Sequence, residues 1–212
     1  LDKYCDIILV GDSLGNVLYG MKNTHNVSLY TMIEHAKSVR QGVKKSLLVV
    51  DMPKNTYNNP LIALKNAKKI LKLSDCDAVK IESNRQNYKI IKKLVKNNVQ
   101  VIGHIGFTPQ YKSKFKVHGS SLSEEKKLLD EAKKIEKAGA FCIVLECISF
   151  KVSKKITKTL KIPTIGIGSS ANCDGQILVT DDMIGLSGFY PKFVKRYGKL
   201  DKIIEKFVQK YR

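Results

Sequence analysis

Acidic side chains end three of the apolar segments in this chain of 212 residues. Asp12 ends the run Ile-Ile-Leu-Val-Gly-Asp, Asp51 ends Leu-Leu-Val-Val-Asp, and Glu82 ends Ala-Val-Lys-Ile-Glu. Converging carboxylates suit a hard divalent cation such as Mg²⁺, which binds one or two of them directly and completes its octahedron with waters and substrate oxygens. The sequence therefore predicts a magnesium site formed by Asp12, Asp51 and Glu82.

Further ionisable side chains continue the same pattern. Lys80 stands two residues before Glu82, so both point to the same face of a strand, and His104 and Glu146 end two further apolar segments. One polar residue at a strand end is more often a helix cap or turn former. Repetition over several strands is typical of barrel enzymes, whose catalytic residues lie at the carboxyl ends of the strands. For His104, a core histidine paired with a backbone carbonyl remains an alternative.

Two other motifs carry weaker signals. The segment Gly-Ile-Gly-Ser-Ser at residues 166–170 could cradle a phosphate, although close backbone packing explains such glycines at least as well. Cys147 stands next to Glu146, but no activating partner is evident in the sequence. We therefore expect Cys147 to be a structural thiol.

The elements that must position these residues alternate along the whole chain. Short apolar segments are separated by amphipathic segments with helical spacing, which is typical of parallel βαβ units. Seven strands are expected, at residues 6–10, 46–50, 78–81, 100–104, 141–145, 163–167 and 176–179. An open doubly wound sheet and a (β/α)₈ barrel both use such units, and the polar strand ends favour the barrel. No long linker interrupts them, so residues 1–212 are interpreted as a single barrel domain.

The composition is that of a globular protein with a strongly basic balance. The chain has 38 Lys+Arg against 19 Asp+Glu, a formal net charge of +19. Such a charge often marks a nucleic-acid-binding protein, but nearly all of these residues are lysines in scattered pairs, and arginine is the residue favoured for base and phosphate recognition. We expect solvated helix faces and no nucleic-acid partner.

The sequence also lacks membrane and disulfide signals. Its apolar stretches are far shorter than the roughly 20 residues that span a bilayer, and no targeting segment is visible at its start. The five cysteines include no Cys-x-x-Cys pair, which favours reduced thiols. A cytoplasmic protein without a membrane partner is the expectation.

Eight motifs, in order, give the chain a specific resemblance to the ketopantoate hydroxymethyltransferases. They are LVGDSLG at 9–15, DMP at 51–53, VKIE at 79–82, GHIGFTPQ at 103–110, LEC at 145–147, PTIGIG at 163–168, DGQILV at 174–179 and PKFVKRY at 191–197. The resemblance implies a (β/α)₈ TIM barrel enzyme of pantothenate biosynthesis. Such an enzyme transfers a hydroxymethyl group from 5,10-methylenetetrahydrofolate to 3-methyl-2-oxobutanoate and gives 2-dehydropantoate. It also implies a homo-oligomer, typically a decamer in the family.

The resemblance assigns roles position by position. Asp12, Asp51 and Glu82 match the family's magnesium site. Asp12, Ser13, Asp51 and Lys80 match its contacts with the oxo acid.

The reaction requires residues of these types. Removing the C3 proton of a 2-oxo acid builds negative charge on the keto oxygen, so Mg²⁺ would stabilise the enolate as a Lewis acid and Lys80 as a point charge. Glu146 matches the family's catalytic base, a role that suits a carboxylate whose pKa is raised by burial. His104 lies in the family's active-site motif, and substrate contact is its favoured role.

Some positions depart from the family pattern, but none of them removes a metal ligand or the base. The departures are Lys54, Ser83, Asn84, Ser120, Ser169 and Ser170, and they bear on folate contacts more than on the type of reaction. Family members also carry a strand and a helix before the region of residue 6. We therefore expect a barrel that lacks its first unit, with unpaired strand edges.

Two alternatives remain open at this stage. Another Mg²⁺-dependent oxo-acid barrel, of the phosphoenolpyruvate mutase and isocitrate lyase type, would share the metal and enolate chemistry. A degenerate, non-catalytic basic binding protein would keep the fold without the activity, and it would bind nucleic acid in a salt-sensitive manner.

Overall fold

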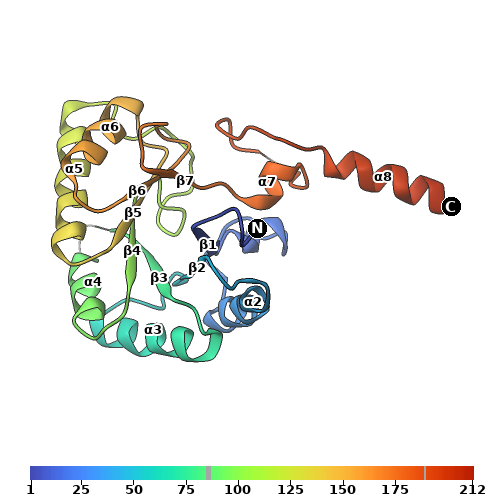
Figure 1. The fold of residues 1–212 in the computed structure, drawn as a ribbon. Helices are drawn as coiled ribbons and strands as arrows, with labels where there is room; N and C mark the ends of the chain where they lie inside the picture. The colour runs from blue at the N-terminus through green and yellow to red at the C-terminus, as the bar shows by residue number, and fades with distance from the viewer. Residues whose placement is uncertain (85–86, 189) are drawn as a thin grey trace.

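Seven parallel strands form one sheet in the order β1-β2-β3-β4-β5-β6-β7 in the computed structural model, which describes residues 1–84, 87–188 and 190–212. The strands are β1 (Ile7–Val10), β2 (Leu47–Asp51), β3 (Ala78–Glu82), β4 (Val101–Gly106), β5 (Cys142–Glu146), β6 (Thr164–Ile167) and β7 (Gly175–Gln176). The sheet curls into a half-barrel (Figure 1). Within the described residues β1 and β7 each pair on one side only, so the sheet is open between them.

Helices cover the outer, convex side of the sheet (Figure 1). The long ones are α2 (Leu29–Gly42), α3 (Pro60–Ser74), α4 (Tyr88–Val95), α5 (Leu122–Lys137) and α6 (Phe150–Thr159). Their starts follow local capping chemistry, because Ser28 and Ser121 accept hydrogen bonds from backbone N–H groups of the first turns of α2 and α5. The periodicity of the sequence predicts all five.

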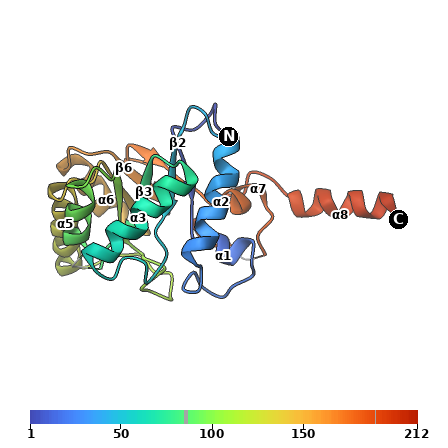
Figure 2. The ribbon, with the colours of Figure 1, turned by 90° about the horizontal axis from the view of Figure 1, so that it is seen from below.

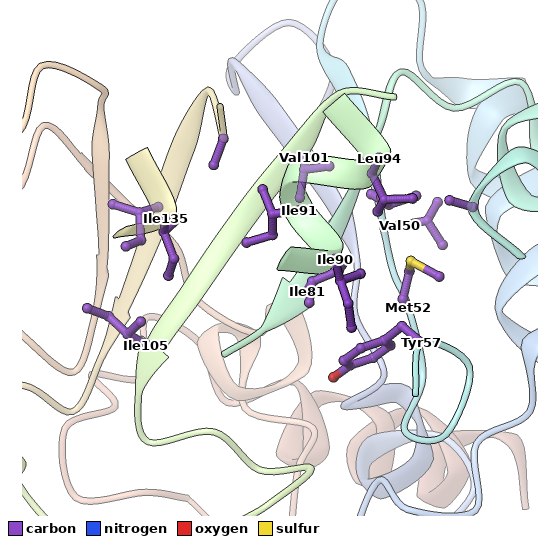
Figure 3. Packing of buried hydrophobic residues seen from close by; sticks show 14 of the residues in the cluster. Val50, Met52, Tyr57, Ile81, Ile90, Ile91, Leu94, Val101, Ile105 and Ile135 are labelled. Carbon is purple, nitrogen blue, oxygen red and sulfur yellow. The ribbon is translucent and has the colours of Figure 1, made fainter. Parts of the chain in front are cut away.

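Apolar side chains form a core on each face of the sheet. The larger core lies between the sheet and the helices and includes Ile81, Ile91 and Val101 (Figure 3). The smaller core fills the concave side and consists of Val49, Ala78, Ile102, Cys142, Val144 and Ile165. Since side chains alternate between the two faces of a strand, each central strand contributes to both cores.

The last strand differs from the sequence-based expectation. We predicted residues 176–179, but β7 is Gly175–Gln176. The N–H group of Ile177 still donates to the Gly166 carbonyl, after which the chain turns at Val179 into α7 (Thr180–Ile184). The short helices α1 (Leu14–Val17) and α7 are too brief to show a helical period, so the sequence analysis missed them.

The chain ends in α8 (Leu200–Tyr211), which extends away from the half-barrel (Figures 1 and 2). It has no buried residue, although Phe207 and Val208 are apolar. Among the described residues, no helix combines the length and the hydropathy that crossing a membrane requires.

Candidate active site

A cluster of buried polar side chains, here called the mouth, forms where β1 to β5 end on the concave face of the sheet. It consists of Asp12, Asp51, Lys80, Glu82, His104 and Glu146. In β3, Val79 and Ile81 pack in the outer core, so the alternate residues Lys80 and Glu82 point inward. The register of the sheet places Lys80 next to Asp51, and Glu82 next to the β4 histidine. The inward residues of the neighbouring strands are Asp51, His104 and Glu146.

Asp12, Asp51 and Lys80 form one buried group in the mouth. The N–H group of Asp12 donates to Asp51 Oδ2 at 3.0 Å, and Lys80 Nζ lies 2.9 Å from Asp51 Oδ1. Each of the three residues is at most 6% exposed. Asp51 Oδ1 makes an ion pair but no hydrogen bond with the described residues, so lone pairs remain on this oxygen.

His104 stands between Lys80 and Glu146. Lys80 Nζ lies 3.3 Å from His104 Nδ1, and His104 Nε2 lies 3.1 Å from Glu146 Oε2, although the second pair is not aligned for a hydrogen bond. Burial, together with the charge of Lys80, lowers the pKa of His104 well below its usual value. A neutral ring that accepts from the Lys80 ammonium at Nδ1 carries its proton on Nε2, which faces Glu146.

Burial raises the pKa of three carboxyl groups of the mouth. It raises the pKa of Glu146 to about 8 and that of Glu82 well above its usual value. Burial and the charge of Asp51 raise the pKa of Asp12 to about 7. Burial disfavours the Lys80 ammonium, but Asp51 and the other carboxylates offset this, and the pKa of Lys80 is raised. The mouth thus holds more acidic than basic groups.

These donors fit a magnesium ion with few protein ligands. In the part of the chain that the structure describes, no three His, Cys, Asp or Glu side chains are arranged to hold a metal ion by themselves. Mg²⁺ needs no such cage, because it retains waters and takes only one or two carboxylates. Asp12 and Asp51 could provide these carboxylates. Their negative charges repel each other, which a cation between them would relieve, and Asp51 Oδ1 has free lone pairs.

Gln110 is a site residue that the sequence analysis did not single out. Its Nε2 group donates to Asp12 Oδ2 at 2.8 Å and to the Met52 carbonyl at 3.0 Å, and its backbone N–H donates to Glu82 Oε2 at 3.0 Å. The Tyr57 hydroxyl donates to Gln110 Oε1. Gln110 therefore fixes two carboxylates of the mouth. The only sequence signal was its position at the end of the motif at 103–110.

The turn after β4 brings another segment next to Glu146. Gly106 has a φ of +97°, and a Cβ atom there would lie 2.1 Å from the Glu146 carbonyl oxygen. The next N–H group, of Phe107, donates to that carbonyl at 2.8 Å.

Cys147 is buried, and burial raises the pKa of its thiol to about 12. A thiol that stays protonated fits the structural role expected from the sequence.

The structure also places the remaining sequence-predicted residues. Ser13 is the N-cap residue of α1, and its side chain makes no capping hydrogen bond. A Cβ at Gly168 would lie 2.5 Å from the Phe193 ring, and Ser169 Oγ donates to the Ile148 carbonyl at 3.0 Å. Close packing therefore fills the space at the glycine-rich turn. This agrees with the alternative in the sequence analysis, close backbone packing in place of a phosphate cradle.

Comparison with known proteins identifies the family. The sequence matches the family model described as ketopantoate hydroxymethyltransferase over residues 1–212. A 3-methyl-2-oxobutanoate hydroxymethyltransferase from Pelagibacter ubique (strain HTCC1062) is 53% identical over 212 residues, which cover 100% of this chain and 82% of that protein. A protein of the same name from Anaplasma marginale (strain Florida) is 47% identical over 214 residues, which cover 100% of this chain and 77% of that protein.

Solved structures with a similar fold are more distant in sequence. A 2,3-dimethylmalate lyase of the PEP mutase/isocitrate lyase superfamily matches with a TM-score of 0.61 at 14% identity, covering 98% of this chain and 71% of that chain. A putative phosphonomutase from Burkholderia cenocepacia J2315 matches with a TM-score of 0.59 at 10% identity, covering 99% and 85%. Such identities show the fold alone, an α/β barrel architecture, and do not favour the mutase alternative. The match over the full chain shows that it belongs to the ketopantoate hydroxymethyltransferase family, the hydroxymethyltransferases of pantothenate biosynthesis.

Proposed function

We propose that this protein joins a one-carbon unit from 5,10-methylenetetrahydrofolate to C3 of 3-methyl-2-oxobutanoate. The net reaction consumes one water and releases 2-dehydropantoate and tetrahydrofolate. One observation carries the proposal: the buried series Lys80, His104 and Glu146 lies beside the Asp12 and Asp51 carboxylates. This set contains a base, an ammonium group and cation ligands, which are the groups needed to remove a proton next to a keto group.

Glu146 removes the C3 proton in this proposal. Glu146 is the last residue of β5 and is 9% exposed. Because burial raises its pKa to about 8, its carboxylate is a stronger base than an exposed glutamate. A base with a pKa near the working pH is the most effective one for general catalysis.

Asp12, Asp51 and Glu82 would hold Mg²⁺ in this proposal. When bound, the ion supplies a Lewis acid that polarises the keto group. Gln110 donates to Glu82 Oε2 from its backbone N–H and to Asp12 Oδ2 from its side chain, so both carboxylates are held in position. The donor set is all oxygen, as Mg²⁺ prefers.

Lys80, His104 and Ser13 bind and orient the oxo acid. The Lys80 ammonium stabilises negative charge that develops on the keto oxygen. The neutral His104 ring, whose Nε2 lies 3.1 Å from Glu146 Oε2, contacts the substrate between Lys80 and the base. The Ser13 hydroxyl is free of a capping hydrogen bond and donates to the substrate carboxylate.

The proposal extends to the assembly. Residues 1–212 form a single domain of the (β/α)₈ barrel type that supplies seven of the strands, and the unit that the family carries before the region of residue 6 would pair with the free edges of β1 and β7. The protein functions as a homo-oligomer, a decamer.

The test is product formation by the purified protein. With Mg²⁺, 3-methyl-2-oxobutanoate and 5,10-methylenetetrahydrofolate, mass spectrometry should detect 2-dehydropantoate, and chelation of Mg²⁺ should abolish it. Phosphoenolpyruvate should not be consumed under the same conditions. Consumption of phosphoenolpyruvate without formation of 2-dehydropantoate would contradict the proposal.

A further inference from the structure

Three phenylalanines form an aromatic cluster next to the mouth, and none of them has a role in the proton transfer described above. The rings of Phe107 and Phe115 are 4.2 Å apart between centroids, with an interplanar angle of 33°. The ring centroid of Phe193 lies 6.4 Å from that of Phe115, at an angle of 58°. The cluster thus joins the loop that follows β4 to the segment between α7 and α8.

The aromatic cluster is attached to the strand end that carries Glu146. The backbone N–H of Phe107 donates to the Glu146 carbonyl, so the inner ring belongs to a residue bonded to the strand end that carries the base. Phe193 lies against Gly168, where any side chain would collide with its ring. Two of the three rings are therefore held in place by the ends of β4, β5 and β6.

Phe115 is the ring that a ligand can reach. Phe107 is 2% exposed, whereas Phe115 is 50% exposed. Because Phe115 is half exposed and its ring lies against the buried Phe107 ring, an apolar aromatic surface lies beside the mouth. Offset stacking on such a surface suits a planar heterocycle.

The segments that carry these rings are strongly basic. The loop around Phe115 includes Lys112, Lys114 and Lys116, and Lys192 precedes Phe193. Lys112 Nζ donates to the Gly106 carbonyl, which places this ammonium at the end of β4. A flat ring with an anionic tail would match both the aromatic surface and the surrounding charge.

We propose that Phe115, supported by Phe107 and Phe193, stacks on the pterin ring of the folate donor, and that Lys114 and Lys116 attract its glutamate tail. This inference rests on the proposed function, since it names the subsite for the one-carbon donor of that reaction.

Direct binding of tetrahydrofolate to the protein of residues 1–212 tests the inference without turnover. Isothermal titration calorimetry should show that Phe115→Ala and Phe115→Leu weaken tetrahydrofolate binding about tenfold, as expected for the loss of one stacked ring. Phe115→Leu keeps an apolar side chain and removes only the aromatic face, so it separates stacking from packing. Phe115→Tyr should bind tetrahydrofolate as the wild type does.

Two comparisons complete the experiment. Tyr30→Ala removes an exposed aromatic ring from α2 and should leave tetrahydrofolate affinity unchanged. None of the variants should shift the affinity for 3-methyl-2-oxobutanoate with Mg²⁺ to the same extent as the folate affinity. Equal tetrahydrofolate affinities of wild type and Phe115→Leu would overturn the aromatic subsite, whereas absence of 2-dehydropantoate formation would overturn the proposed function instead.

The proposed attraction of the folate glutamate tail by Lys114 and Lys116 is tested separately. Tetrahydrofolate pentaglutamate should bind more tightly than the monoglutamate at low salt, because screening weakens attraction between exposed charges. The double variant Lys114→Gln, Lys116→Gln should remove most of this difference. If the two folates bind the double variant and the wild type with the same ratio of affinities, the lysines do not bind the tail.

Discussion

The charged side chains of the mouth and those of helix α8 differ in burial and in the partners that they contact. In the mouth, acidic and basic groups from four strands and from the turn after β1 are buried and contact partners far away in the sequence, as Lys80 contacts Asp51 at 2.9 Å. In α8 every residue is exposed or nearly so, and its ion pair, Lys202 with Glu205 at 3.0 Å, joins residues one turn apart. A group of buried charges with distant partners is a candidate site for chemistry, whereas the charges of α8 are exposed to solvent.

The net charge follows the same division. The chain as a whole carries +19, yet the mouth holds Asp12, Asp51, Glu82 and Glu146 against the single buried ammonium of Lys80. The excess of lysine therefore lies on the outside of the half-barrel. This distribution would allow a strongly basic chain to hold the proposed site for a divalent cation.

Removing Lys80 should give the largest effect. Lys80→Met leaves buried carboxylates without their ammonium partner, and breaking such a pair destabilises a protein by about 3 to 5 kcal/mol. Lys202→Met in α8 is the matched control and should stay within about 0.5 kcal/mol of the wild type. Urea denaturation without Mg²⁺ measures both. Similar free energies of unfolding for the two variants would contradict the claim that the buried charge of Lys80 contributes more to stability than the exposed charge of Lys202.

Gln110→Glu should have the next largest effect. The new carboxylate would face Asp12 and the Met52 carbonyl, so two hydrogen bonds are lost and two acids repel each other. We expect a destabilisation of roughly 1 to 3 kcal/mol and weaker Mg²⁺ binding by calorimetry. Gln209→Glu makes the same change on α8 and should alter neither. Unchanged Mg²⁺ affinity in Gln110→Glu would show that Gln110 only supports the loop.

The pH dependence of proton exchange should report the burial of Glu146. Because burial raises its pKa to about 8, the group is protonated, and inactive as a base, below that pH. The kcat/KM for exchange at C3 should rise about tenfold per pH unit below the pKa and level off above it. A plateau that already begins near pH 5, as for an exposed glutamate, would contradict the burial of this carboxyl group.

Much of the site was predictable because it depends on the period of a strand. Alternation and the carboxyl-end rule were sufficient to bring Asp51, Lys80 and Glu82 together. Gln110 was not predictable in this way, because it belongs to a loop and its partner Asp12 is 98 residues away. Its role depends on how the loop after β4 folds over the mouth, which no local pattern in the sequence encodes.

The fold shows the same limit at its end. Strands β1 to β6 follow from their apolar segments, whereas β7 shortens to Gly175–Gln176 because the following residues lead directly into α7. In the aromatic cluster, Phe115 and Phe193 come from segments without periodicity. Elements with a regular period could be predicted from the sequence, and contacts made by irregular segments could not.

Deuterium exchange at C3 of 3-methyl-2-oxobutanoate tests the central claim, that Glu146 is the base of the mouth. Proton NMR in D₂O, with Mg²⁺ and without folate, should show exchange by the wild type. In Glu146→Gln exchange should fall by roughly 10² to 10⁴-fold, while calorimetry still detects binding of the oxo acid. Exchange at the wild-type rate in Glu146→Gln would contradict the account.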